Sequence, residues 1–291
     1  SNDRFGNFKI KIMKKSKNIF LGKKILIYGL GKSGISSYKF LKNKAKIYLF
    51  DDNRKKNLKI SQKQIKFREV RKIKLDRIII SPGIDITNCK LSNFLKKNFS
   101  KIYTDLDIFS SFYKNESITI TGTNGKSTTA TILYKVLLDQ KKDVRLIGNI
   151  GNPVLSEKRI TKGTKFVIEA SSYQLDYSKI FRSKYAIILN IRADHIERHR
   201  SLRNYINAKF KLLESQTKNC IAYVKKNDEY INQKVKSKKF NCKIIKVDTK
   251  KVDAIFKSIS NDYFLTETNK ENLSFVIKVS KKLKLKKRLV F

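Results

Sequence analysis

Residues 117–139 read SITITGTNGKSTTATILYKVLLD, and this stretch decides the fold. Its first five residues alternate isoleucine with hydroxyl side chains, as a buried β-strand can, and the residues after Lys126 are typical of an amphipathic helix. Two glycines, Gly122 and Gly125, lie between these two elements. A strand, a turn and a helix form the repeating unit of parallel α/β domains, so the stretch predicts such a domain.

The glycine turn is a candidate phosphate-binding loop. Backbone N–H groups of such a turn can cradle phosphates, Lys126 can reach the terminal phosphates, and the Ser127 hydroxyl can bind Mg²⁺. The loop is about two residues shorter than the usual phosphate loop. A chance Gly-Lys-Ser turn is the alternative, and the strand and helix on either side argue against it.

A second glycine turn, GLGKSG at residues 29–34, follows an apolar strand pattern and precedes a helical one. Asp51 and Asp52 end the next expected strand, about 20 residues further on, which is the spacing of a dinucleotide-binding fingerprint. Glycines let the backbone approach a diphosphate, and the helix N-terminus adds free N–H groups and a positive dipole. The motif fits NAD and a UDP-sugar equally well, and a tight turn without a ligand is the remaining alternative.

Further polar residues stand where other expected strands end. Glu169 ends an apolar run, and acids at this end of a strand beside a phosphate loop commonly hold Mg²⁺ or water. His195 follows another strand and can reach the same edge. His199 lies four residues later, as in a zinc-protease helix, but Glu197 is at the wrong position for that motif. We therefore expect His195 near a metal and His199 at the surface; the turn SPGI at residues 81–84 is a weaker signal.

Short apolar strands alternate with amphipathic helical stretches, which predicts mostly parallel α/β sheets. The expected strands are Lys24–Tyr28, Lys46–Phe50, Arg77–Ile80, Ser117–Thr121, Val144–Ile147, Lys165–Glu169, Tyr185–Asn190 and Asn219–Val224. The expected helices are Ser33–Lys42, Asp105–Tyr113, Ser127–Asp139, Leu202–Glu214 and Glu271–Leu285. We divide the chain into an extension (1–20), a first domain (21–114), a second domain (115–275) and a final segment (276–291).

The composition is strongly basic, with 67 lysines and arginines against 24 acidic residues and a formal net charge of +43. Such a charge suggests nucleic-acid binding, but the lysines are spread along the whole chain and aromatic residues do not interleave with them. An AT-rich coding bias explains the excess of lysine, isoleucine and asparagine. Three scattered cysteines, and apolar runs much shorter than about 18 residues, favour a cytoplasmic protein.

Taken together, the motifs resemble the Mur ligase family. The elements that carry the resemblance are GLGKSG (29–34), SPGI (81–84), TGTNGKST (121–128), GNIG (148–151), EASSYQL (169–175), Asp194-His195 and Ala208-Lys209. They extend over residues 21–285, and the short phosphate loop is itself a feature of this family. The resemblance implies a Rossmann-like first domain for a UDP-substrate, followed by a P-loop-type, mostly parallel α/β ATPase domain.

The resemblance also implies roles for individual residues. The substrate-binding positions are Gly29, Gly31, Gly34, Asp51, Asp52, Ser81, Asn149 and Ser171. The ATP-binding positions are Gly122, Thr123, Asn124, Gly125, Lys126, Ser127, Thr128 and Asn272, the last in a segment where Thr268 replaces the family's histidine. The Mg²⁺ ligands are Ser127, Glu169, His195 and Lys209, and Lys209 matches a lysine that the family carbamylates. The catalytic positions are Lys126, His195 and Lys209.

Within the family, the resemblance points to the members that join D-glutamate to UDP-N-acetylmuramoyl-L-alanine in peptidoglycan precursor synthesis. ATP phosphorylates the L-alanine carboxylate, and the amine of D-glutamate then attacks the acyl phosphate. We expect ATP and Mg²⁺ as cofactors and a monomer without a membrane span. The alternatives are an L-alanine-adding member, which typically has histidine where Asn124 stands, an NAD-dependent oxidoreductase and a nucleic-acid-binding protein.

The family has a third domain that completes the ATP site and binds the incoming amino acid, and the chain ends near the point where that domain should begin. We therefore expect the chain alone to bind the UDP-substrate, to bind ATP weakly and to turn over poorly. Met13 is the only methionine. We expect the residues before it to be an upstream extension.

Overall fold

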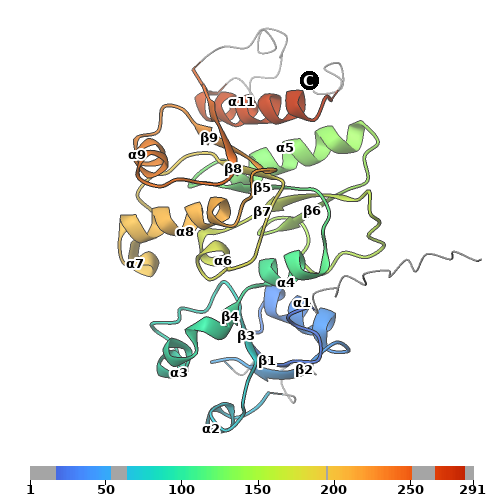
Figure 1. Ribbon diagram of the computed structural model, residues 1–291, viewed down its shortest axis with the longest axis vertical. Helices are drawn as coiled ribbons and strands as arrows, with labels where there is room; N and C mark the ends of the chain where they lie inside the picture. The colour runs from blue at the N-terminus through green and yellow to red at the C-terminus, as the bar shows by residue number, and fades with distance from the viewer. Residues whose placement is uncertain (1–17, 54–63, 195, 251–265, 286–291) are drawn as a thin grey trace, which may run out of the picture.

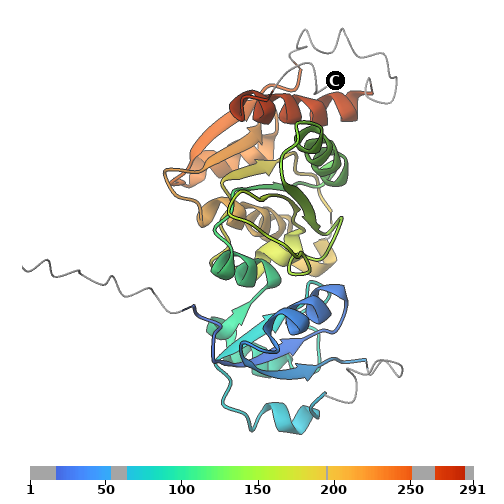
Figure 2. The same ribbon diagram turned by 90° about the vertical axis from the view of Figure 1, so that its right-hand side faces the viewer.

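The computed structural model describes residues 18–53, 64–194, 196–250 and 266–285. Two parallel sheets, each covered by helices, follow one another along the long axis of the molecule (Figure 1, Figure 2). The α/β class that the sequence predicts is confirmed. Among the described residues, every helix is too short or too polar to cross a membrane.

The first sheet has four parallel strands in the order β2-β1-β3-β4. The strands are β1 (Lys24–Tyr28), β2 (Lys46–Phe50), β3 (Arg77–Ile80) and β4 (Ile102–Tyr103), and the helices between them are α1 (Lys32–Leu41), α2 (Phe67–Val70) and α3 (Ser92–Lys97). The central strand β1 is buried at every position after Lys24, which explains its continuous apolar run. Helix α4 (Asp105–Phe112) then leads to the second sheet.

The second sheet has six strands in the order β10-β9-β8-β5-β7-β6, and all its pairings are parallel. Its strands are β5 (Ser117–Thr121), β6 (Val144–Gly148), β7 (Lys165–Glu169), β8 (Tyr185–Ile188), β9 (Ile221–Lys225) and β10 (Lys243–Val247). Its helices are α5 (Lys126–Asp139), α6 (Ser172–Asp176), α7 (Ile196–His199), α8 (Leu202–Glu214), α9 (Glu229–Ser237) and α11 (Glu267–Lys282).

Helices cover both faces of the second sheet. Helices α5 and α11 lie on one face, where Leu133 and Phe275 join a core cluster with Ile118 and Ile120 of β5 (Figure 1). Helices α6 and α8 lie on the other face, where Phe210 packs in a second cluster. Because side chains alternate between the faces of a strand, the isoleucines of β5 point into one core and its threonines point to the opposite face of the sheet.

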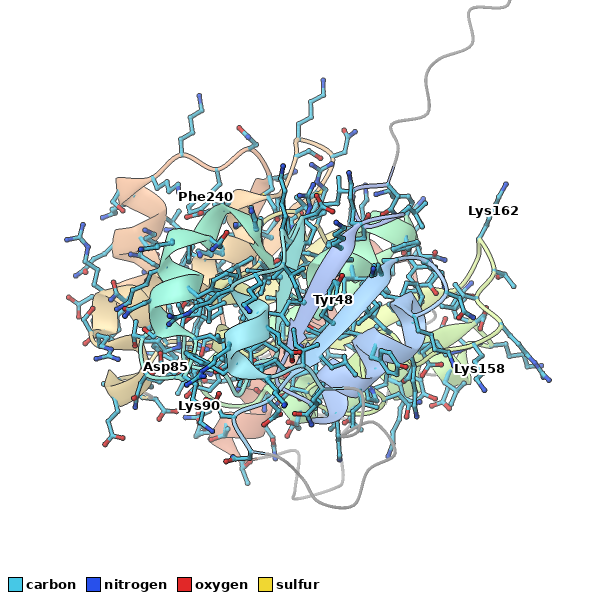
Figure 3. The ribbon with its side chains drawn as sticks, turned by 90° about the horizontal axis from the view of Figure 1, so that it is seen from below. Tyr48, Asp85, Lys90, Lys158, Lys162 and Phe240 are labelled. Atoms are coloured by element: carbon cyan, nitrogen blue, oxygen red, sulfur yellow. The ribbon has the colours of Figure 1, made fainter. Side chains whose placement is uncertain are left out.

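The expected strands and helices are confirmed, with ends that differ by a few residues. Several short elements were not predicted from the sequence, among them β4 and the edge strand β10, where lysines interrupt the apolar pattern. Helix α11 begins at Glu267, four residues before the expected start, and the expected boundary at 275–276 falls inside this continuous helix. The lysines leave the surface in many directions: Lys158 and Lys162 lie on the opposite side from Lys90 (Figure 3).

Candidate nucleotide and substrate site

The phosphate loop connects β5 to α5 through two glycines with positive φ. Gly122 has φ of +155° and Gly125, the N-cap of α5, has φ of +82°. A side chain at Gly125 would collide with Asn272, since its Cβ would lie 2.1 Å from the Asn272 Oδ1. The loop therefore presents the N–H groups at the start of a 14-residue helix, with Thr128 in the first turn. Helix α11 brings the buried Asn272, an expected ATP-binding residue, against this loop.

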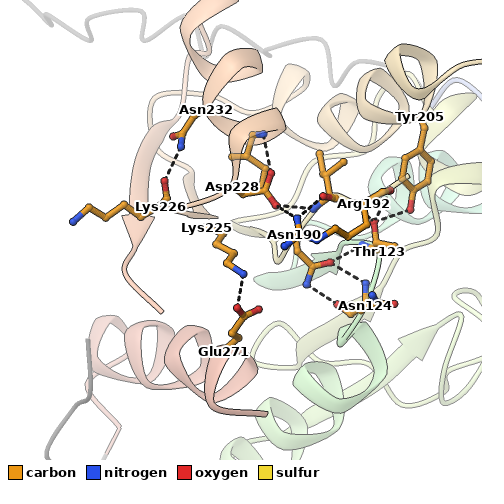
Figure 4. A network of polar contacts seen from close by, with 12 residues as sticks. Thr123, Asn124, Asn190, Arg192, Tyr205, Lys225, Lys226, Asp228, Asn232 and Glu271 are labelled. Carbon is orange, nitrogen blue, oxygen red and sulfur yellow. Dashed lines mark hydrogen bonds and ion pairs between the residues drawn. The ribbon is translucent and has the colours of Figure 1, made fainter. Parts of the chain in front are cut away.

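The Asn190 side chain fixes the conformation of the loop, a role that was not predicted from the sequence. Its Oδ1 accepts hydrogen bonds from the N–H groups of Thr123 (3.2 Å) and Asn124 (2.9 Å), and its Nδ2 donates to the Asn124 carbonyl at 3.2 Å (Figure 4). The Thr123 hydroxyl lies 3.1 Å from the Tyr205 hydroxyl. An asparagine directly after the apolar run of β8 was the signal that could have found it.

Lys126 folds back over the loop. Its Nζ donates to the carbonyls of Gly122 at 3.0 Å and Thr123 at 2.7 Å. Burial lowers the pKa of Lys126, while the nearby charges of Glu169 and Asp194 raise it. The ammonium group thus lies inside the loop, at the place where a bound phosphate would meet it.

Glu169, Ser127 and Asn149 come together at the carboxyl ends of the strands. The Ser127 hydroxyl donates to Glu169 Oε2 at 2.8 Å, and Asn149 Nδ2 donates to Glu169 Oε1 at 3.1 Å. Glu169 is 1% exposed, so its charge has few other means of solvation. Hydroxyl and carboxylate oxygens are the ligands that Mg²⁺ prefers, and this pair fits one edge of a coordination sphere completed by phosphate and water oxygens.

Lys209, on α8, is as deeply buried as Glu169, with 1% exposure. Its Nζ donates to the Gly122 carbonyl at 2.8 Å and lies 4.4 Å from the centroid of the Tyr205 ring. Burial and the neighbouring charge of Lys126 lower the pKa of Lys209 to about 7. The structure thus separates this lysine from the many others in the chain and places it beside the phosphate loop.

The structure tests the prediction for one of the two histidines. His195 lies outside the described residues. The expectation that His199 lies at the surface is wrong, because it is only 4% exposed. Its ring stacks on Tyr173 with centroids 5.2 Å apart, and its Nε2 lies 3.0 Å from the Ser172 hydroxyl. Helix α7 is short, and its last residue turns inward against α6.

The first glycine loop is built for close backbone approach. A Cβ at Gly34 would lie 1.8 Å from the Gly29 carbonyl oxygen, so the start of α1 packs directly on the loop. Ser81 donates its hydroxyl to the same carbonyl at 2.6 Å. Among the described residues, the space that a Gly31 side chain would enter is open to 4 Å.

A groove of about 720 Å³ passes Gly31 and runs between α1 and residues 153–158. Its lining includes four lysines, Lys32, Lys39, Lys44 and Lys158. An open backbone at a helix N-terminus, flanked by positive charge, is suited to an anionic ligand.

The carboxylates of Asp51 and Asp52 accept hydrogen bonds from groups of the protein itself. Asp51 accepts hydrogen bonds from the N–H groups of Leu30 (2.5 Å) and Asn53 (2.9 Å), and so holds the glycine loop. Asp52 accepts one from the Tyr28 hydroxyl at 2.6 Å. Burial and this hydrogen bond raise the pKa of Tyr28, which keeps the hydroxyl a donor.

A buried carboxylate links the first glycine loop to α6. Ser33 donates its hydroxyl to Asp105 Oδ2 at 2.5 Å, and Gln174 Nε2 donates to both oxygens of Asp105 at 3.3 Å. Ser171 caps α6 by accepting the Gln174 N–H at 3.2 Å. Asp105 was not predicted as a functional residue, although it directly precedes the apolar residues of α4, and Gln174 was singled out only as part of the motif at residues 169–175.

Comparison with known proteins places these features in one family. The Mur ligase middle domain matches residues 120–289, and the Mur ligase MurD-like N-terminal domain matches residues 23–102. A UDP-N-acetylmuramoylalanine--D-glutamate ligase of Rickettsia bellii is 35% identical over 268 residues, which are 88% of this chain and 58% of the relative. The same-named protein of Rickettsia prowazekii is 38% identical over 220 residues, or 73% of this chain and 48% of the relative.

A solved structure shares the fold. The UDP-N-acetylmuramate:L-alanyl-gamma-D-glutamyl-meso-diaminopimelate ligase from Neisseria meningitides matches with a TM-score of 0.51 at 15% identity, over 77% of this chain and 78% of that one. This chain spans between 48% and 58% of the lengths of the two Rickettsia relatives. The Mur ligase middle domain alone matches more than half of the residues, including the phosphate loop and Glu169, and the chain therefore belongs to the Mur ligase family.

Proposed function

We propose that this chain forms the UDP-substrate and ATP-binding parts of an enzyme that ligates D-glutamate to UDP-N-acetylmuramoyl-L-alanine. The observation that carries the proposal is the meeting of Ser127, Asn149 and Glu169 beside the phosphate loop, with the first glycine loop tied to the same region. The names of the Rickettsia relatives support D-glutamate as the amino acid. We assign the UDP-substrate to residues 21–114 and ATP to residues 115–275, together with the part of α11 that carries on beyond Asn272.

The phosphate loop would act by electrostatic stabilisation. Its N–H groups and the Lys126 ammonium would neutralise the charge that develops on the transferring phosphoryl group. Ser127, Glu169, His195 and a carbamylated Lys209 are the proposed holders of Mg²⁺, which would polarise the phosphate oxygens. Asn149 and Ser171 lie at the same edge and would orient the L-alanine carboxylate toward that phosphate. The amine of D-glutamate would then attack the acyl phosphate, and inorganic phosphate would leave.

The first glycine loop would bind the diphosphate of the UDP-substrate. Gly31 leaves the backbone open, the start of α1 supplies N–H groups, and the lysine-lined groove favours negative charge. Asp51 and Asp52 lie beside the loop, and we propose that the base of the nucleotide meets them there. Their contacts to Leu30 and Tyr28 would keep the carboxylates oriented.

Calorimetric titration with UDP-N-acetylmuramoyl-L-alanine tests the first site. Replacing Gly31 by valine should weaken binding by about tenfold to a hundredfold, because nothing lies within 4 Å of the new Cβ and the added side chain would occupy the space open to the ligand. Gly163→Val, outside the residues that line the groove, is the matched control and should bind like the unchanged chain. If the unchanged chain bound NAD or a short DNA in place of the UDP compound, the proposal would fail.

Carbamylation of Lys209 gives a second expected result. Because its pKa is lowered to about 7, a large fraction of the amine is neutral at pH 8 and can add CO₂, whereas exposed lysines stay protonated. With ¹³C-labelled bicarbonate, we expect one slowly exchanging carbamate signal by NMR at pH 8, and its loss near pH 6 as the amine takes up a proton. Lys209→Met should lack the signal and Lys211→Met should keep it; a signal that survives in Lys209→Met would contradict the assignment.

A further inference from the structure

Arg198 lies on a helix beside the second sheet but contacts the turn next to the first glycine loop. It lies in the short helix α7, and its guanidinium donates to three carbonyl oxygens of one turn, those of Pro82 (3.1 Å), Gly83 (3.4 Å) and Ile84. Its Nε also lies 4.0 Å from Asp85 Oδ2. The side chain is only 20% exposed, so most of its surface is shielded from water. A planar guanidinium can serve several acceptors at fixed angles, which a lysine cannot do.

The turn that Arg198 holds is in rigid contact with the glycine loop. The Ile84 N–H donates to the Ser81 carbonyl at 3.0 Å, and the Ser81 hydroxyl donates to the Gly29 carbonyl at 2.6 Å. A Cβ at Gly29 would lie 2.8 Å from both Ile84 and Ser81, so the turn and the loop touch without a gap. A shift of the turn would therefore move the diphosphate-binding backbone with it.

The same guanidinium also packs against α6. Its carbon lies 4.8 Å from the centroid of the Tyr173 ring, and this ring also stacks on the buried His199. His199 in turn meets the Ser172 hydroxyl, one residue after Ser171 and three after Glu169. Contacts thus run from the turn at residues 82–84 through Arg198, Tyr173 and His199 to Ser172, which follows the strand that ends at Glu169.

We infer that Arg198 is a positioning residue that sets the distance and orientation between the UDP-binding loop and the phosphate loop. The inference rests on the proposed function, because only a substrate that reaches both loops would sense their relation. UDP alone would contact the first loop only. UDP-N-acetylmuramoyl-L-alanine must extend from that loop to Asn149 and Glu169, so its binding depends on how the two loops are set.

Arg200 provides a matched control. It also pairs with Asp85, at 3.7 Å, and its guanidinium donates to the Thr87 hydroxyl, but its side chain is 57% exposed. Exposed ion pairs of this kind contribute little. Arg200→Ala removes the same charge from the same helix end without touching the carbonyls of residues 82–84.

The experiment is calorimetry of the whole chain with UDP, UDP-N-acetylmuramoyl-L-alanine and ATP, on the unchanged protein, Arg198→Ala, Arg198→Lys and Arg200→Ala. We expect Arg198→Ala to weaken binding of the full UDP compound by about tenfold, which corresponds to the loss of one charge-assisted contact. Binding of UDP and of ATP should stay within about twofold, because each ligand senses one loop only. Arg198→Lys should restore part of the loss, and Arg200→Ala should match the unchanged chain.

Energy transfer between dyes on the two domains gives an independent readout. The dyes are attached at Lys46→Cys and Lys135→Cys in a chain whose own cysteines are replaced by serine. Arg198→Ala should broaden the distance distribution, and Arg200→Ala should not. Equal binding of the full compound by Arg198→Ala and the unchanged chain would overturn the inference. An equal loss for UDP would also overturn it, since that pattern marks local damage to the glycine loop. Failure of the unchanged chain to bind the UDP compound would instead overturn the proposed function.

Discussion

Lys126→Ala should lower the affinity for ATP about 100-fold. The Lys126 ammonium lies within 3.0 Å of two loop carbonyls, Gly122 and Thr123, at the place where the terminal phosphates of a nucleotide would lie. A hydrogen bond to a charged group contributes about 1.5–3 kcal/mol, and the upper part of that range corresponds to roughly two factors of ten in affinity. Calorimetric or fluorescent-nucleotide titration at constant Mg²⁺ measures the effect.

Lys135→Ala is the control for this prediction. Lys135 lies on the same helix, α5, but its side chain is exposed and it is more than two turns from the loop. Its removal takes away the same formal charge and should leave ATP affinity within about twofold, since exposed charges are screened by salt. If both variants lost affinity equally, the effect would be one of total charge, and the assignment of the loop would be wrong.

Asp107→Ala should destabilise the folded chain by about 3–5 kcal/mol, because it removes a fully buried carboxylate that accepts hydrogen bonds from five groups. Asp107, on α4, is 0% exposed. The groups that donate to its carboxylate are the N–H groups of Thr104 (2.9 Å), Lys179 (2.9 Å), Ile180 (2.8 Å) and Phe181 (3.1 Å) and the hydroxyl of Ser178 (2.8 Å). With alanine in its place, these five donors would lose their shared acceptor, and those of Thr104 and Phe181 lie in buried contacts.

Chemical unfolding followed by circular dichroism measures this loss. Asp139→Ala, at the exposed end of α5, is the matched control and should change the free energy of unfolding by less than about 0.5 kcal/mol. Asp107→Asn should lie between the two, because its side-chain oxygen keeps one acceptor. A change below about 1 kcal/mol for Asp107→Ala would show that water replaces the carboxylate, and that the turn after α6 does not depend on it.

Much of this protein could be predicted from local sequence patterns. The run from Ser117 to Asp139 fixed a strand, a glycine turn and a helix, because the period of apolar residues and the freedom of glycine act over short distances. The Lys126, Ser127 and Glu169 positions followed for the same reason: the carboxyl ends of parallel strands meet at one edge, so an acid that ends an apolar run lies near the loop. The hydrogen bond between Ser127 and Glu169 agrees with that expectation.

Partners that lie far apart in the chain were decided by the tertiary structure alone. His199 was expected at the surface, yet it is buried and stacks on Tyr173. Asp105 accepts hydrogen bonds from both Ser33 and Gln174, and no spacing in the sequence predicts a contact between these segments. Such contacts depend on how helices pack on a sheet, and local periodicity carries no information about it.

Lys209 shows the difference most clearly. In the sequence it is one of 67 basic residues, and only the resemblance to a family singled it out. In the folded chain it is 1% exposed beside Lys126, and burial lowers its pKa to about 7. The sequence determined which elements form and where their polar ends meet. The packing of α8 against the phosphate loop decided which lysine is desolvated. Desolvation depends on the atoms that surround a group in space and not on its neighbours along the chain.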